Sequence, residues 1–416
     1  MQVSVPELLR RNYNYRLLWS GQIVSDIGDH FNNIAVFSLA IGQQHGGLLV
    51  GGILIARAIP MLVAGPLAGV ILDRYDRRKV MMTSDLVRAV LALGFILAVT
   101  RKDTALLFIL SALLMFASPF FTSGRNSILP VVAKGEELPT ANAVTQITSW
   151  ATTGIGAFFG GTAVAGLGYE WAFVLNSLSF LLSWICLSFF RNEPNEFMPP
   201  AKHEKREFHP HQEFVEGLRY MRSEPLLLAI AMIGVGWATG GGAAQILFSV
   251  FGEKVFHRGP QGIGIIWGAA GLGLVVGGLV ANYMNKRLGF EEYKKTVSIA
   301  YLFHGGMYVL FAFETNFALA LVFIGLSRAA GSISSVVNYS KVLTYAEDRY
   351  RGRVFATMET MTWTTMMISL FVAGIATEKF DPRHIAAIAG VLSGTTGVIW
   401  AWANWRGWLR LPQNRS

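Results

Sequence analysis

Residues 69–78 read GVILDRYDRR and separate two long apolar runs of this 416-residue chain. The pattern returns at residues 278–287, which read GLVANYMNKR and again follow an apolar run. A constant offset of 209 aligns Gly69 with Gly278, Asp73 with Asn282, Arg77 with Lys286 and Arg78 with Arg287. Self-similarity between the two halves of a chain indicates an internal repeat. Two repeated halves are typical of one class of secondary transporters.

The composition indicates a membrane protein. Hydrophobic residues make up 52% of the chain and charged residues 15%, compared with roughly 25% charged residues in soluble domains. The mean hydropathy is +0.43, and the 44 glycines suit the close packing of helices in lipid. A secreted disulfide scaffold is excluded because Cys186 is the single cysteine.

Twelve apolar stretches are long enough to cross a bilayer, which takes about 20 residues each. The first six are 16–42, 48–72, 81–100, 104–124, 140–167 and 170–190. The other six are 225–251, 261–284, 294–313, 316–338, 354–377 and 383–404. We therefore predict an all-α integral membrane protein with twelve transmembrane helices in two six-helix pseudo-repeats. Its parts are an N-terminal bundle (1–190), a cytoplasmic linker with a short helix near its end (191–222) and a C-terminal bundle (223–416).

The positive charges predict which ends of the spans face the cytoplasm. With the N-terminus inside, 26 of the 35 Lys and Arg residues fall in cytoplasmic segments and 6 in outside loops. This is the positive-inside bias, and with twelve spans it places both termini in the cytoplasm. A basic face next to anionic lipid also accounts for the net charge of +9. We therefore expect a lipid bilayer and no nucleic acid among the partners.

Residues 69–78 resemble motif A of the Major Facilitator Superfamily, with Gly69, Asp73, Arg74, Arg77 and Arg78 at the motif positions. The chain departs from the motif at Asp76, where glycine is usual. Further stretches resemble the enterobactin-exporter and macrolide-efflux branch: 12–19 (NYNYRLLW), 21–22 (GQ), 127–130 (SILP), 136–143 (EELPTANA) and 351–355 (RGRVF). The resemblance covers essentially the whole chain and implies the Major Facilitator fold, a bacterial inner (plasma) membrane location and a monomer.

The resemblance also implies a conformational latch at motif A. In the family, the aspartate that matches Asp73 faces the start of the eleventh span and closes the cytoplasmic side when the cavity opens outward. The partner segment here contains Arg351 and Arg353. A carboxylate at a helix N-terminus contributes about 0.3–1 kcal/mol, which suits a latch that must reopen. The alternative, a positive-inside loop alone, explains Arg77 and Arg78 but not an acid among them.

A polar stripe runs along the first span. Its members recur at three- and four-residue spacing and therefore share one helix face: Gln22, Asp26, Asp29, His30 and Asn33. Asp29 lies about 20 Å from the cytoplasmic end at 1.5 Å per residue. An ionised acid facing lipid there costs at least about 2.5–3.5 kcal/mol, so the stripe must face a cavity or another helix.

Two hypotheses explain the acids of this stripe. Arg57 in the second span lies at comparable depth, so an ion pair with Asp29 or Asp26 is geometrically reasonable. In the first hypothesis, Asp26 or Asp29 takes up and releases a proton as the cavity changes its access to water. In the second, a permanent Asp–Arg pair only holds the two spans together. Two acids and one arginine leave an acid over, which favours proton coupling.

The second half offers further polar residues within spans. Glu359 is either a second proton site or the ion partner of Arg328, while His304 is expected to be a hydrogen-bonded packing residue. Trp237 and Gln245 belong to the glycine-rich run 236–245 of span seven.

With Gln22 and Asn33, Trp237 and Gln245 are candidates for a substrate cavity wall, and the alternative for the glycine-rich run is a packing interface without a ligand. In span three, the spacing of Asp85 and Arg88 predicts a local ion pair near the membrane surface.

Two departures weaken the match with drug–proton antiporters of the family. The fourth span holds no basic residue between Ala105 and Ser123, where many of them have an arginine. Ala157 replaces the proline of their Gly-Pro-x-x-Gly-Gly signature at residues 156–161.

The expected function is proton-coupled efflux, an antiport of small amphipathic organic molecules of the drug, macrolide or siderophore type, by alternating access. Protons would act through Asp26, Asp29 and Glu359. The chain contains no nucleotide-binding loop, zinc signature or nucleophile motif, so we expect neither an enzyme nor a metal or other cofactor. The alternatives are an uncoupled, lipid or nutrient transporter, and a non-transporting membrane receptor of the same fold.

Overall fold

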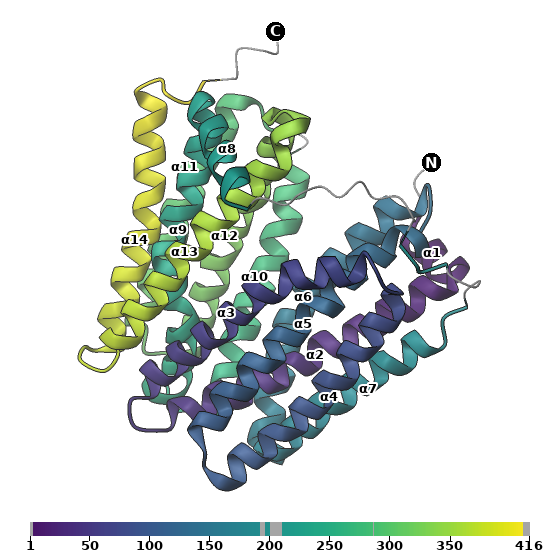
Figure 1. Cartoon of the computed structure of the whole chain (residues 1–416). Coiled ribbons are helices and arrows are strands. Elements are labelled where there is room, and N and C mark those ends of the chain that lie inside the picture. Colours follow the sequence, from purple (N-terminus) through teal and green to yellow (C-terminus); the bar gives the residue numbers. More distant parts are fainter. Residues whose placement is uncertain (1–2, 192–195, 200–209, 286, 411–416) are drawn as a thin grey trace. The chain divides into compact units, whose positions relative to one another are not determined.

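The computed structural model describes residues 3–191, 196–199, 210–285 and 287–410. Within these ranges the regular structure is helical (Figure 1). The long helices of the first half are α2 (Tyr13–Ile41), α3 (Gly46–Leu72), α4 (Arg77–Arg101), α5 (Thr104–Val132), α6 (Glu137–Leu167) and α7 (Tyr169–Ser188). Those of the second half are α9 (Pro225–Val250), α10 (Gly259–Asn285), α11 (Phe290–Phe313), α12 (Phe317–Tyr345), α13 (Asp348–Ala376) and α14 (Pro382–Trp405). Shorter elements are α1 (Val5–Arg11), α8 (Pro210–Ser223) and the π-helix η1 (Phe251–Val255).

Each predicted span coincides with one of these long helices, and α8 is the short helix expected at the end of the linker. Among the described residues, nine helices are long and apolar enough to cross a membrane. The helices α2, α6 and α13 are long enough but more polar, because they carry much of the acid, amide and threonine content discussed below. The all-α membrane fold is thereby confirmed.

The largest boundary differences lie at ends predicted to be cytoplasmic. α5 continues to Val132 and α12 to Tyr345, and α13 already begins at Asp348. The length of an apolar run matches the thickness of the hydrocarbon layer. The helix itself can continue beyond that layer, so its ends lie outside the apolar run. Arg125 consequently lies inside α5, although the sequence placed it in a loop.

The chain forms two compact units. The first holds Met1–Glu204 with Gly252–Gly268, and the second holds Lys205–Phe251 with Ala269–Ser416. In the first unit α2 packs on α6 and α7, α4 packs on α5 and α7, and α3 packs on α5.

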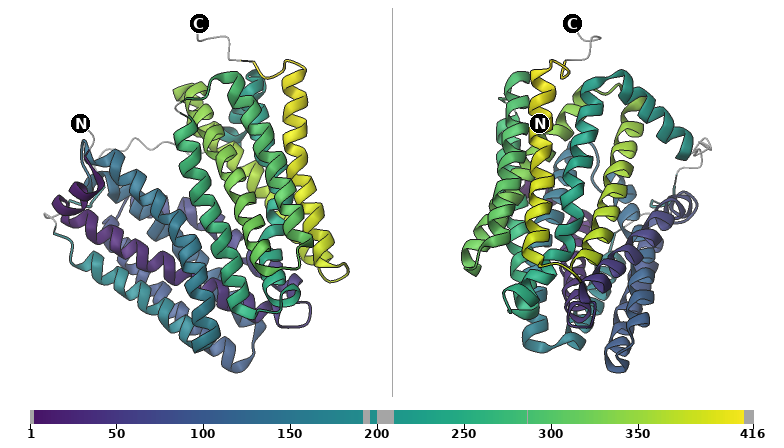
Figure 2. Two further views of the ribbon diagram at one scale, coloured as in Figure 1. Left: turned by 180° about the vertical axis from the view of Figure 1, so that it is seen from behind. Right: turned by 90° about the vertical axis from the view of Figure 1, so that its left-hand side faces the viewer.

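The second unit repeats this packing. α9 packs on α13 and α14, and α11 packs on α12 and α14, which runs alongside its neighbours in yellow in both views of Figure 2. α10 approaches α12 so closely that a Cβ added at Gly273 or Gly277 would meet the backbone of Gly325 or Ala329. Every helix pair of the first unit named above thus has its counterpart, as expected for an internal repeat.

The helix ends correct the alignment of this repeat by four residues. α3 ends at Leu72 and α10 at Asn285, while α4 begins at Arg77 and α11 at Phe290, so the structural offset is 213. At the sequence-derived offset Asp73 was paired with Asn282, which lies inside α10, although Asp73 follows the end of α3. Four residues are about one helical turn, so a slip of four preserves the apolar pattern. Lys286, also part of that alignment, lies outside the described residues.

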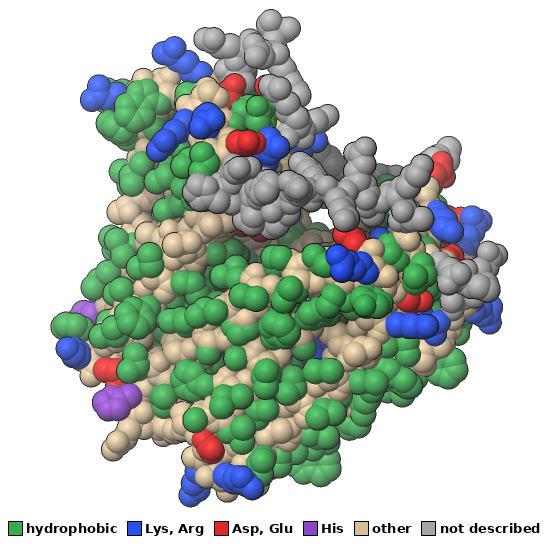
Figure 3. Space-filling view, viewed as in Figure 1, with side chains coloured by type: hydrophobic (Ala, Val, Ile, Leu, Met, Phe, Trp, Pro, Cys, Tyr) green, Lys and Arg blue, Asp and Glu red, His purple; other side chains and the backbone are tan. Residues whose placement is uncertain are grey.

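The outer surface is apolar along the helices. On the face shown in Figure 3, hydrophobic side chains cover the flanks of the helices, and charged side chains gather near the helix ends. Large apolar residues such as Leu62 and Val90 are 70% and 71% exposed. An exposed apolar surface of this kind is what a bilayer covers.

Candidate functional site

Gln22 and Asp26 of the polar stripe of α2 contact α6. Gln22 donates hydrogen bonds to Ser149 Oγ at 2.9 Å and to Asp26 Oδ2 at 3.2 Å. Thr152 of α6 donates to the same carboxylate oxygen at 3.4 Å. Asp26 is therefore held by two neutral donors.

Arg57 of α3 binds amide oxygens and not acids. Its Nη1 donates to Asn33 Oδ1 at 2.6 Å and its Nη2 to Asn32 Oδ1 at 3.0 Å. Its guanidinium also lies 5.2 Å from the ring centre of Phe37. The expected ion pair of Arg57 with Asp29 or Asp26 is wrong, because no described carboxylate lies within 4.0 Å of it.

The ion partner of Asp29 is Arg88 of α4. Arg88 Nη1 lies 4.0 Å from Asp29 Oδ2, and Arg88 Nη2 donates to Asp85 Oδ1. The rings of Phe121 and Phe180 lie 4.5 and 4.3 Å from the same guanidinium.

The expected Asp85–Arg88 pair is present, and it is buried within the protein. The Asp85 side chain is fully buried and that of Arg88 is 2% exposed. α4 begins at Arg77, which puts Asp85 about 12 Å into the helix at 1.5 Å per residue.

Arg125 was missed by the sequence reasoning. It lies in α5, and its charge attracts that of Asp26. The apolar run was ended at Gly124, but that glycine is a packing residue, since a Cβ there would lie 3.2 Å from Met81 Sδ. A glycine inside a membrane helix more often marks close helix packing than a helix end. The fourth membrane helix therefore does carry an arginine.

The first unit thus holds a balanced cluster of three acids (Asp26, Asp29, Asp85) and three arginines (Arg57, Arg88, Arg125) among its described residues. The expected surplus acid is wrong, because that count left out Asp85, Arg88 and Arg125. Asp29 is nevertheless weakly held. Its Oδ1 is buried without a hydrogen-bond partner in the described structure, its ion pair is long, and 29% of its side chain is exposed.

His30 packs against glycines of α6. A Cβ added at Gly156 would lie 2.9 Å from His30 Cδ2, and one added at Gly160 would lie 2.9 Å from the carbonyl oxygen of His30. These glycines let α2 approach α6 closely, which is a structural reason for the glycine run of span five.

In the second unit, Arg328 of α12 and Glu359 of α13 do not pair. The Arg328 guanidinium lies 4.9 Å from the ring centre of Phe248 and 5.9 Å from that of Tyr308, and Glu359 is exposed. The ion-pair alternative for Glu359 is therefore wrong within the described residues, and its proton role stays a prediction. His304 is the expected packing residue, since its Nδ1 lies 2.8 Å from Ser327 Oγ.

The predicted wall residues of α9 are half-buried. Trp237 packs against the hydrophobic core of the second unit, and Gln245 lies two turns further along the helix.

Motif A joins α3 to α4. Asp73 is exposed, as is Arg74, and the Asp73 carboxylate has no hydrogen bond or ion pair to any described residue. Arg77 Nη1 donates to Ser127 O at 3.2 Å, and Arg78 Nη2 donates to Ser188 O at 2.7 Å. These two arginines therefore bind the ends of α5 and α7 to the motif.

Asp76, where the motif usually has glycine, caps α4. Its Oδ1 accepts a hydrogen bond from Lys79 N at 3.1 Å. Aspartate is one of the preferred residues at such a position because it satisfies a free backbone donor. Gly289 stands at the corresponding place before α11.

The predicted latch partners lie at the start of α13. Arg353 Nη1 forms an ion pair with Glu216 Oε2 of α8 at 2.8 Å, and Arg351 Nη2 donates to Ala346 O at 3.5 Å.

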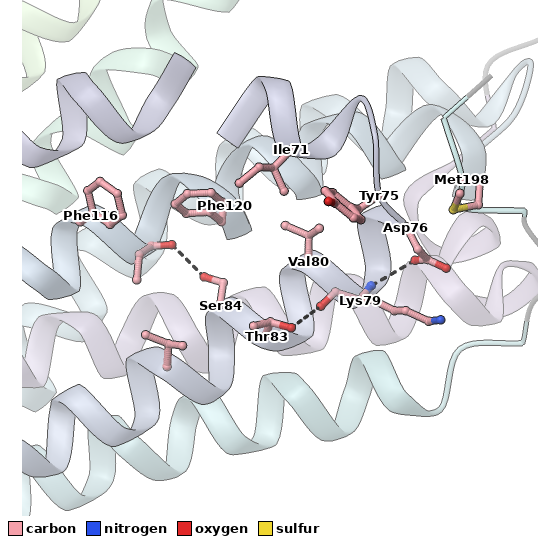
Figure 4. Close-up of a pocket in the computed structure, with 12 residues that line it drawn as sticks. Ile71, Tyr75, Asp76, Lys79, Val80, Thr83, Ser84, Phe116, Phe120 and Met198 are labelled. Atoms are coloured by element: carbon pink, nitrogen blue, oxygen red, sulfur yellow. Dashed lines mark hydrogen bonds between the residues drawn. The ribbon is translucent and has the colours of Figure 1, made fainter. Parts of the chain in front are cut away.

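A cavity of about 590 Å³ opens next to motif A (Figure 4). Ile71, Val80, Phe116 and Phe120 form much of its apolar wall, and Lys79 lies at one end. This cavity belongs to the first unit, and Gln22, Asn33, Trp237 and Gln245 do not line it.

Comparison with known proteins gives consistent matches. Residues 18–291 and 242–407 match the model of the Major Facilitator Superfamily. The enterobactin exporter EntS of Citrobacter koseri is 25% identical, over 92% of this chain and 90% of its own. The multidrug efflux pump Tap of Mycolicibacterium fortuitum is 28% identical, over 82% of this chain and 84% of its own. The crystal structure of the nucleoside transporter NupG shares the fold, with a TM-score of 0.73 at 12% identity over 94% of this chain and 98% of that one.

Proposed function

The chain belongs to the Major Facilitator Superfamily and is a multi-pass transporter of the inner membrane, and we propose that it exports small amphipathic organic molecules in exchange for protons. Relatives named as a siderophore exporter and a multidrug efflux pump support the substrate class. We further propose that it acts as a monomer with both termini in the cytoplasm, as the charge bias predicts.

Asp29 carries the proposal of proton coupling. It lies on the polar stripe of α2, is partly exposed, and has a buried oxygen without a partner among the described residues. Asp85 already neutralises Arg88, so Asp29 can bind a proton without leaving Arg88 uncompensated. Water access stabilises the carboxylate form, and closure of the cavity favours the neutral acid. Alternating access would thus make Asp29 bind a proton on one side of the membrane and release it on the other.

Asp26 and Glu359 are secondary candidates for proton binding. Asp26 accepts hydrogen bonds from Gln22 and Thr152, which stabilise its charged form. We therefore expect Asp29 to be the main proton carrier.

Motif A supplies the proposed latch. The exposed Asp73 carboxylate, without a partner in the described structure, is available to bind the helix start that carries Arg351 and Arg353. Asp73→Asn should reduce transport about two- to fivefold, as expected for a contact of about 0.3–1 kcal/mol, while substrate binding stays within twofold, because the latch acts on the conformational change and not on the substrate. Arg353→Gln would give a smaller loss, since Glu216 already holds that side chain.

The test uses everted membrane vesicles with an imposed proton gradient and a pH-sensitive dye. Siderophores, macrolides, cationic dyes and lysolipids are added to the wild type, to Asp29→Asn and to the surface control Glu7→Gln. We expect at least one compound to collapse the gradient in the wild type and the control but not in Asp29→Asn.

Two outcomes would overturn the proposal. A wild-type response in Asp29→Asn would show that this acid carries no coupled proton. Binding of a compound without any gradient collapse would instead indicate an uncoupled transporter or a receptor.

A further inference from the structure

Arg328 is a basic residue deep in a membrane helix, and it has no charged partner among the described residues. It lies about 16 Å from the start of α12 at 1.5 Å per residue. Its Nε is buried and makes no hydrogen bond to a described residue, and no described acid lies within 4.0 Å of the guanidinium. Intramembrane basic residues usually pair with an acid or with backbone carbonyls, or mark the path of a substrate or ion.

A second hydrogen-bond donor without a described partner lies next to Arg328. The hydroxyl of Tyr308 is buried and has no hydrogen-bond partner in the described part of the chain. The rings of Phe248 and Tyr308 face the guanidinium, and His304, the other titratable group beside them, is engaged with Ser327. Arg328, Tyr308 and His304 line one narrow cleft together with Gly240, Gly241 and Ser393. The cleft has no free volume for even a water molecule in this structure, so a group that binds there must displace the side chains that line it.

The aromatic rings compensate only part of the charge. Cation–π contacts are weaker than an ion pair in a desolvated site, and a buried donor without an acceptor is costly. Two such donors in one cleft share a single missing partner, a group that accepts hydrogen bonds and carries negative charge. A neutral acceptor would satisfy the hydrogen bonds but leave the charge of Arg328 uncompensated, and a cationic group would be repelled by it.

We propose that Arg328 and the Tyr308 hydroxyl bind an anionic group, such as a carboxylate or sulfonate, of the transported molecule. The substrates are then amphipathic anions. This inference rests on the proposed transport function, because it identifies the bound molecule as the substrate. It concerns binding alone and does not depend on proton coupling.

The probe pair is 8-anilino-1-naphthalenesulfonate and N-phenyl-1-naphthylamine, which share their ring system and differ in the sulfonate. Both are titrated by fluorescence onto the full chain in lipid nanodiscs, with empty nanodiscs subtracted. We expect Arg328→Gln to weaken binding of the sulfonate at least tenfold and to change binding of the neutral amine by less than twofold. Arg328→Lys, which keeps the charge, should lose less than Arg328→Gln.

Tyr308→Phe provides a second variant that keeps the ring. Because the hydroxyl has no partner within the described residues, its removal should leave the melting temperature unchanged or raise it, while sulfonate binding weakens about threefold. The matched control is Arg287→Gln, which removes an exposed arginine that also lies over a ring, that of Tyr283. This control should leave both probes unaffected.

Equal losses for the two probes in Arg328→Gln, or no loss for either, would overturn the proposal. So would a wild type that binds the sulfonate no better than empty nanodiscs do. The result is separable from proton coupling, because the sulfonate titration uses no proton gradient. Loss of gradient collapse with intact sulfonate binding would reject only the coupling.

Discussion

The two units treat buried charge in opposite ways. In the first, Asp85 and Asp29 flank Arg88, and the described cluster holds three acids and three arginines, although Arg57 binds amides and no acid. In the second, Arg328 has aromatic neighbours and no acid among the described residues. Since the helix packing is the same in both units, the fold itself does not require either arrangement. The difference therefore indicates a division of roles, with charge movement in the first unit and ligand charge in the second.

Removing the central cation of the first unit should have the largest effect on stability. Arg88→Met leaves Asp85 buried without a counter-ion, and breaking a buried pair in this way typically costs about 3–5 kcal/mol. The loss is measured as a shift of the unfolding transition in mixed detergent micelles. The double variant Arg88→Met/Asp85→Asn should recover most of it, and failure to do so would mean that Arg88 acts by packing.

The corresponding change in the second unit should be much milder. Arg328→Met gives up cation–π contacts of about 0.5–2 kcal/mol but also removes a poorly solvated charge, so the net change should stay within about 1 kcal/mol. The same micelle titration measures it. A loss of unfolding free energy as large as that of Arg88→Met would indicate that Arg328 has an acidic partner. The proposed difference between the two units would then be wrong.

A third comparison concerns the residue that precedes each of the corresponding helices α4 and α11. Asp76→Ala removes the side-chain cap on Lys79 N and should cost about 1 kcal/mol, whereas Asp76→Gly should cost only a few tenths. Unfolding of the purified protein distinguishes the two. Equal losses would show that the aspartate acts through its charge within motif A and not as a cap.

The smallest effect is expected for the reciprocal substitution, which introduces an aspartate at Gly289. Gly289 stands before α11 with φ −66° and ψ 169°, a conformation open to any residue. Gly289→Asp should therefore add a cap and stabilise the protein by a few tenths of a kcal/mol. A destabilised variant would indicate that the nearby acid Glu292, which binds the Gly289 amide, repels the new carboxylate.

Helix positions could be predicted from sequence because the bilayer imposes a length on each apolar run. The register of the repeat could not, since a slip of one turn keeps Gly69 and Gly278 on apolar faces. The cap at Asp76 explains a motif departure that looked arbitrary in the sequence.

The ion partners of the charged residues were predicted less well than their positions along the helices. Depth follows from counting residues along a helix, but the partner depends on how each helix is rotated about its axis. Asp85 and Arg88 were found because they lie on the same helix. The pairing of Asp29 with Arg88, and of Arg57 with Asn33, joins different helices, and a single sequence contains no direct signal for it.

Two corresponding helix pairs have equal lengths in the two units, which suits both units to one membrane thickness. α3 and α10 each have 27 residues, and α5 and α12 each have 29, although their sequences differ. A helix of 27 residues is about 40 Å long, which exceeds the roughly 30 Å of hydrocarbon in a typical bilayer. Lipids with longer or shorter acyl chains would therefore create hydrophobic mismatch in both units at once, and activity in reconstituted membranes should pass through a single optimum of acyl-chain length.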